Sequence, residues 1–109
     1  MKKIVIKKVP QSKIRNKGVG DYLRTPGGIE IRIANVKDDT FEKGVAIHEM
    51  VESLLVDKRK ISFSKINKWD KKNIKKKGEP GEMKGSPYFK EHAIANKIER
   101  MLVKELKKK

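Results

Sequence analysis

The sequence contains only two histidines, and each has a glutamate beside it. His48 begins the pattern H-E-x-x-E, which ends at Glu52, and Glu91 directly precedes His92. Residues four apart lie on one face of a helix, one turn apart, so His48 and Glu52 could bind a single cation. Glu49 lies about 100° further round such a helix, on the side where a metal-bound water would be. These residue types at this spacing indicate metal-assisted hydrolysis.

The pattern differs only in its last residue from the H-E-x-x-H motif of zinc metallopeptidases, in which the histidines bind zinc and the glutamate is the general base. A glutamate at that position still offers an oxygen ligand. A third ligand from a distant helix would leave one coordination position open, as in catalytic zinc sites. His92 is the candidate for this ligand, and Glu91 is the alternative, either as a ligand or as a residue that orients one.

Glu49 and Glu52 also form an E-x-x-E pair, the magnesium-binding motif of all-helical nucleotide pyrophosphohydrolases. The predicted strands described below, and the lack of a matching second acidic pair in the helical part of the sequence, argue against that interpretation.

Apolar spacing predicts three helices that position these residues. The first covers 41–57, and its core-facing stripe is expected to contain Ile47, Met50, Val51, Leu54 and Leu55. The second begins near Ser62 or Ser64, and its apolar residues are Phe63, Ile66 and Trp69. The third covers 87–106, with Ser86 as N-cap and Pro87 in the first position. Its predicted inner face contains Ile94, Ile98, Met101 and Leu102.

The first third of the sequence predicts strands. Residues 2–9 form one, with Ile4 and Ile6 on the same side. Residues 29–34 alternate between isoleucines and polar residues, and the Pro-Gly-Gly turn before them predicts a hairpin with 21–25. The order of elements predicts an α+β fold: a small N-terminal antiparallel sheet of about three strands, packed with about three helices.

At 109 residues the chain is expected to form a single domain over 1–109. Its β-rich part is 1–36 and its helical part is 41–106, in which 71–85 is a lysine-rich connection. Residues 107–109 form a basic tail.

The chain is strongly basic, with a net charge of +15 from 29 Lys and Arg against 14 Asp and Glu. This charge could attract nucleic acid or an acidic partner, although no aromatic nucleic-acid-binding motif accompanies it. The absence of cysteine excludes disulfides and thiolate metal sites. No apolar run is long enough for a membrane segment, so the cytoplasm is the expected location. The candidate polyanion-binding residues are Lys71, Lys72, Lys75, Lys76 and Lys77.

Several motifs follow one another in a distinctive order. They are V-G-D at 19–21, a strand at 29–33, A-x-H-E-x-x-E at 46–52, Trp69-Asp70, E-P-G-E at 79–82, and P-Y-x-x-E-H-x-x-A-x-x-I-E at 87–99. In this order the chain resembles a family of small proteins encoded by bacteriophages and prophages. It departs from that family at Asn67, where members carry Asp, and in its larger positive charge.

The resemblance implies a minimal zincin-like metallopeptidase in the cytoplasm of an infected or lysogenic host cell. In such a protein His48, Glu52 and His92 would bind zinc, and Glu49 would activate a water molecule. Tyr88 would stabilise an oxyanion, with a packing role at the helix start as its alternative. The other motif residues are Asp70, Glu79, Glu82 and Glu99.

The resemblance also implies a peptide or protein substrate, which could pair in extended form with strand 29–34. The leading hypothesis is therefore a zinc-dependent hydrolase. The alternatives are a domain in which the metal is only structural, and a basic protein that binds nucleic acid or an acidic partner.

Overall fold

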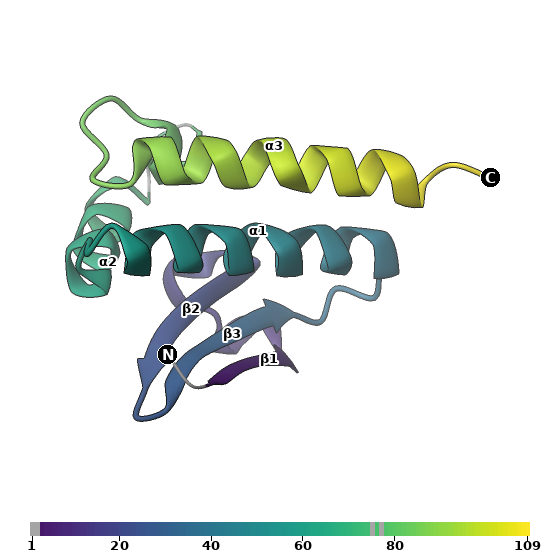
Figure 1. The fold of residues 1–109 in the computed structure, drawn as a ribbon, viewed down its shortest axis with the longest axis horizontal. Helices are drawn as coiled ribbons and strands as arrows, with labels where there is room; N and C mark the ends of the chain where they lie inside the picture. Colours follow the sequence, from purple (N-terminus) through teal and green to yellow (C-terminus); the bar gives the residue numbers. More distant parts are fainter. Residues whose placement is uncertain (1–2, 75, 77) are drawn as a thin grey trace.

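A computed structural model describes residues 3–74, 76 and 78–109 of the chain. Three strands, β1 (Lys3–Val9), β2 (Gly20–Thr25) and β3 (Gly28–Ala34), form one sheet in the order β1-β3-β2 (Figure 1). The predicted hairpin is confirmed, because β2 pairs antiparallel with β3. With the three helices described below, the sheet gives the predicted α+β fold.

β1 runs parallel to β3, so the sheet is mixed rather than wholly antiparallel as expected. The reason is that residues 10–27 lead the chain back to the end of the sheet at which β1 begins. Gly28 starts β3 directly against Lys3, and a Cβ atom at Gly28 would lie 1.8 Å from the Lys3 carbonyl oxygen. The parallel register therefore requires glycine at this position.

Three helices complete the fold: α1 (Asp39–Lys58), α2 (Phe63–Asn73) and α3 (Phe89–Leu106). α1 lies between the sheet and α3, and α2 packs near one end of both helices (Figure 1). Ser62 caps α2, since its hydroxyl accepts a hydrogen bond from the backbone of Lys65. Within the described residues, none of these helices combines the length and the apolar character needed to cross a bilayer.

The start of α3 differs from its prediction. The N-cap is Tyr88 rather than Ser86, and its side chain makes no capping hydrogen bond. The Ser86 hydroxyl accepts a hydrogen bond from the Tyr88 backbone instead, in a turn that precedes the helix.

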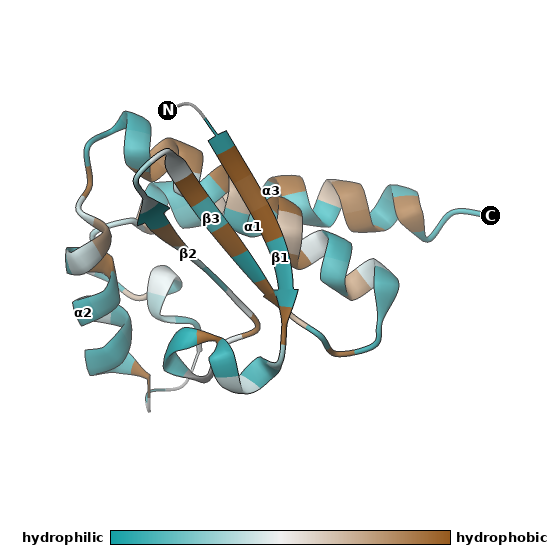
Figure 2. Ribbon diagram, turned by 90° about the horizontal axis from the view of Figure 1, so that it is seen from below, coloured by the Kyte–Doolittle hydropathy of each residue, from teal (hydrophilic) through white to brown (hydrophobic). Residues whose placement is uncertain are grey.

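The core lies between the inner face of the sheet, α1 and α2. Ile29 and Ile31 on β3 and Val56 on α1 are its largest fully buried apolar side chains. Figure 2 shows the hydrophobic residues of β1 and β3 side by side, but β1 lies at the sheet edge and leaves Ile4 and Ile6 exposed.

The predicted inward faces of α1 and α3 are confirmed only in part, since Met50 of the α1 stripe packs against the core. The stripe predicted for α1 is only half-buried, and on α3 Ile94 and Met101 are 37% and 61% exposed. α1 packs against the sheet on one side and against α3 on the other, so its least exposed residues are those in contact with these two elements. Several of these least exposed residues are polar. The buried residues of α1 are Glu42, Gly44, Val45, His48, Glu52, Ser53 and Val56.

Gly44 explains how closely α3 approaches α1. A Cβ atom there would lie 2.9 Å from Val103 and 3.5 Å from the Cγ atom of Glu99, both on α3. Glycine in a helix interior costs about 1 kcal/mol relative to alanine. Here its lack of a side chain lets α3 lie close enough to bring its own charged residues to α1.

Candidate metal centre

Two helices bring His48, Glu52 and His92 together at the interface of α1 and α3. The Oε2 atom of Glu52 lies 3.1 Å from Nε2 of His48 and 2.8 Å from Nδ1 of His92. All three residues are buried, and their ligand atoms lie within 4.8 Å of one another. Although 40 positions separate Glu52 from His92, the predicted convergence exists. The three side chains are positioned to bind a metal ion.

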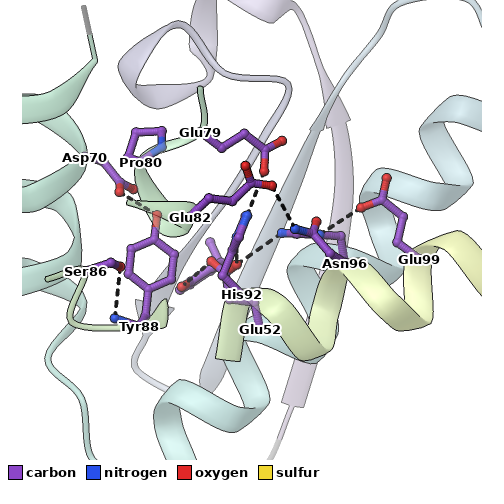
Figure 3. Close-up of polar contacts among 12 residues, drawn as sticks. Glu52, Asp70, Glu79, Pro80, Glu82, Ser86, Tyr88, His92, Asn96 and Glu99 are labelled. Carbon is purple, nitrogen blue, oxygen red and sulfur yellow. Dashed lines mark hydrogen bonds and ion pairs between the residues drawn. The ribbon is translucent and has the colours of Figure 1, made fainter. Parts of the chain in front are cut away.

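Each histidine also has a carboxylate near its other ring nitrogen. Nε2 of His92 lies 2.7 Å from Oε2 of Glu79, which precedes the short 3-10 turn η3 (Pro80–Glu82). Nδ1 of His48 lies 2.8 Å from Oε1 of Glu99 on α3. The second contact is short but not aligned for a hydrogen bond, so Nδ1 of His48 has no hydrogen-bond partner among the described residues. Figure 3 shows His92 between Glu52 and Glu79.

Tyr22 is a member of the site that the motif analysis missed. Its hydroxyl donates a hydrogen bond of 2.9 Å to Oε1 of Glu52, which leaves Oε2 for the histidines. The available signal was strand alternation, because Tyr22 lies opposite Ile31 and therefore on the same inward face.

The three residues of the cluster shift one another's pKa values. Burial alone would lower the pKa of both histidines, but hydrogen bonds with Glu52 and contacts with a second carboxylate raise it to about 10 for His48 and about 9 for His92. Burial would raise the pKa of Glu52, yet its hydrogen bonds with the histidines lower it. A cation at this position would take the place of the protons on the histidines, so its binding releases protons.

Glu49 lies on the wall of a cavity next to this cluster. A Cβ atom at Gly20 would lie 2.9 Å from Cγ and 3.1 Å from Oε1 of Glu49, so glycine at the start of β2 makes room for the carboxylate. The carboxylate of Glu49 makes no hydrogen bond or ion pair within the described part of the chain. Burial raises its pKa well above 4.5, and the charge of Glu52 adds to this effect.

The cavity has a volume of about 380 Å³ and an acidic lining. Arg15 also lines it, but its backbone and guanidinium are held by Asp21 and by the carbonyl of Tyr22. The lining therefore favours positively charged ligands, above all metal ions. The acidic residues that line it are Asp21, Glu49, Glu52, Asp70, Glu79 and Glu99.

Tyr88 and Asp70 form a pair beside the cluster. The Tyr88 hydroxyl donates a hydrogen bond of 2.5 Å to Asp70, and the Tyr88 ring meets the His92 ring edge-on (Figure 3). Burial raises the pKa of Asp70 to about 6. Tyr88 is buried in the core cluster, as its packing alternative required, and its hydroxyl also faces the cavity wall.

The remaining glutamates of the motifs lie further out. The carboxylate of Glu91 forms a 2.6 Å ion pair with Arg59, so it is neither a ligand nor a partner of the three-residue cluster. Glu82 accepts a hydrogen bond from Asn96 at 3.3 Å and lies near Glu79 and His92 in a more exposed group.

The strand predicted to bind substrate cannot do so. β3 is the central strand of the sheet, and its two sides are hydrogen-bonded to β1 and β2. An extended substrate would have to pair with an outer strand instead.

The predicted polyanion-binding residues are only partly described. Lys71 and Lys72 are exposed on α2, and Lys76 is exposed in the segment after it. Lys75 and Lys77 lie outside the described residues.

Comparisons with protein-family models, curated proteins and solved structures found no significant match.

Proposed function

We propose that this protein is a zinc-dependent hydrolase of the metallopeptidase kind, encoded by a phage or prophage. The observation that carries the proposal is the convergence of buried His48, Glu52 and His92. Imidazole and carboxylate ligands suit zinc, and three protein ligands leave a position for water or substrate. The phage origin rests on the order of the sequence motifs.

A bound divalent ion would lower the pKa of its water ligand and polarise a scissile carbonyl. Glu49 is the residue proposed to take the proton from that water, because its carboxylate lies on the cavity wall with no partner among the described residues. Burial raises the pKa of Glu49, and the charge of a nearby cation would lower it again, which would favour the ionised carboxylate that a general base requires.

The acidic cavity next to the cluster is where a peptide substrate would bind. Tyr88 is the proposed donor to the oxyanion of the intermediate, and its single hydroxyl hydrogen would turn from Asp70 to the oxyanion to do so. Both roles require the metal, so the first test concerns the metal.

Elemental analysis of untagged protein, together with the variants His48→Ala and His92→Ala, tests this proposal directly. The wild type should contain about one zinc ion per chain, whereas each variant should fall to the background level. Glu105→Ala, which removes an exposed glutamate of α3, is the control that should keep the metal. A wild type without metal, or histidine variants that retain all of it, would contradict the proposal.

A second candidate function is the binding of nucleic acid or an acidic partner. It is favoured by the four exposed lysines of α2, which form no ion pair within the described residues. These lysines are Lys65, Lys68, Lys71 and Lys72.

A further inference from the structure

The two histidines of the cluster use their ring nitrogens in opposite ways. His48 directs Nε2 toward Glu52 and Nδ1 toward Glu99, whereas His92 directs Nδ1 toward Glu52 and Nε2 toward Glu79. One nitrogen of each ring therefore faces the shared carboxylate of Glu52. The other faces a carboxylate that the second ring does not contact.

We infer that the metal is bound by Nε2 of His48 and Nδ1 of His92, and that Glu99 and Glu79 are positioning residues that orient the two rings. A neutral imidazole carries one N–H, so a carboxylate that accepts this N–H leaves the other nitrogen free to bind a cation. Partners of this kind orient the ring and raise the basicity of the ligand nitrogen. The inference rests on the proposed function, because it assumes that the cluster binds a metal.

Glu52 cannot serve as the positioning partner itself. Its Oε2 atom is the point where both rings meet, and the hydroxyl of Tyr22 occupies Oε1. If Glu52 accepted the N–H of both rings, the nitrogens left to bind a cation would be Nδ1 of His48, beside Glu99, and Nε2 of His92, beside Glu79, and neither faces Glu52. Glu52 is therefore the third ligand. Glu79 accepts the N–H of His92, and Glu99, 2.8 Å from Nδ1 of His48, would accept the other N–H after a small rotation of the ring or the carboxylate.

The two positioning residues differ in how firmly the fold holds them. Glu99 lies on α3 in the part that packs against Gly44 of α1, and its side chain is 30% exposed. Glu79 lies before η3, and its side chain is 61% exposed. Water can replace an exposed partner more easily than a half-buried one. Glu99 should therefore contribute more to metal affinity than Glu79.

NMR of nitrogen-labelled wild-type protein loaded with an NMR-active cadmium isotope tests the assignment of ligand nitrogens. Cadmium–nitrogen coupling should appear at Nε2 of His48 and at Nδ1 of His92. Coupling at Nδ1 of His48 or at Nε2 of His92 would overturn the inference while leaving the metal site intact. A wild type that binds neither cadmium nor zinc would overturn the proposed function instead.

Metal titrations of Glu99→Gln and Glu79→Gln test the positioning role. Glu99→Gln should weaken zinc binding by about 10- to 100-fold, and Glu79→Gln should weaken it less. The matched control is Glu105→Gln on α3, which should bind zinc as the wild type does. Glu99→Asp, which keeps the acceptor, should recover part of the affinity. Unchanged affinity in both Glu99→Gln and Glu79→Gln would overturn the inference.

Discussion

At the scale of single residues, Glu52 is the side chain on which the site depends. It accepts hydrogen bonds from a strand residue, Tyr22, and contacts a histidine from each of the two long helices. A buried carboxylate is unfavourable unless hydrogen bonds or a cation compensate its charge. Tyr22, His48 and His92 compensate the charge of Glu52, and a metal ion could replace the protons on the two histidines.

Replacing Glu49 by glutamine should separate metal binding from catalysis. Glu49→Gln should reduce hydrolysis of a fluorescent peptide library by about 10²- to 10⁴-fold, because the amide cannot accept the proton of water. Its zinc content should equal that of the wild type, since Glu49 is not one of the three ligands. Undiminished hydrolysis by this variant would show that Glu49 is not the base.

Adding one methyl group at Gly81 should disturb the site without replacing a ligand. The new Cβ atom would lie 2.6 Å from Cγ of His92, so the ring or the η3 segment must move. Gly81→Ala should lower stability by about 1–3 kcal/mol, as overpacking does, and should weaken zinc binding. Chemical denaturation and metal titration measure the two effects.

Gly27→Ala is the matched control, because nothing lies within 4 Å of a Cβ atom at that turn. Its stability and zinc affinity should remain close to those of the wild type. Equal behaviour of the two variants would show that His92 has more room than its packing against Gly81 indicates.

At the scale of elements, the β2–β3 hairpin is fastened by Asp21. Its carboxylate accepts hydrogen bonds from Nε and Nη2 of Arg32 on β3, at 2.8 and 2.6 Å, and from the backbone of Arg15 at 3.0 Å. The carboxylate thereby ties the hairpin to the chain that leads into β2. Burial by itself would raise the pKa of Asp21, but these hydrogen bonds outweigh it and lower the pKa below 3.8.

The lowered pKa of Asp21 predicts a pH dependence of stability. A carboxyl group whose pKa is lower in the folded protein stabilises the fold above its unfolded pKa, and this contribution disappears as the pH falls through the folded pKa. The free energy of unfolding of Asp21→Asn should therefore fall less between pH 5 and pH 2 than that of the wild type. Glu105→Gln, with its exposed ion pair, should follow the wild-type curve.

The hairpin and the start of α2 could be predicted because their signals are local. The isoleucine alternation of 29–34, the turn before it and the cap at Ser62 each act within a few residues. The parallel pairing of β1 and the inward faces of α1 and α3 could not be predicted in the same way. Both depend on which elements pack against each other across the fold.

The same distinction applies to the candidate site. The His48–Glu52 pair follows from helix geometry, and the scarcity of histidine left His92 as the natural third residue. The contact of Glu52 with Tyr22 depends on how the sheet packs against α1, and the ion pair of Glu91 with Arg59 depends on the end of α1 meeting the start of α3. Motif spacing alone does not contain that information.

At the scale of the whole molecule, acidic residues gather around the cavity, whereas the chain as a whole is basic. Six of the 14 acidic residues line one cavity, in a chain that carries a net charge of +15. The exterior would therefore attract polyanions while the cavity attracts cations. The two candidate functions thus use different parts of the surface and can be tested separately.

A variant in which the four lysines of α2 are changed to glutamine should separate the two functions. Its affinity for double-stranded DNA should fall, and the wild-type affinity should decrease steeply with salt. Its zinc content should not change, because none of the four lysines lines the cavity. Fluorescence anisotropy across a salt series measures the DNA affinity, and equal binding by both proteins would exclude α2 as a polyanion-binding face.

The placement of the ligands on α1 and α3 has a consequence for the durability of the domain. An ion shared by Glu52 and His92 would join two points 40 residues apart in the chain and form a reversible cross-link between the helices. Ligands that bind only the folded state stabilise it by about 2.7 kcal/mol at 100 times their dissociation constant. The melting temperature would then rise with the concentration of the ion. In a cell that lacks the ion, the protein would be less stable and more susceptible to proteolysis.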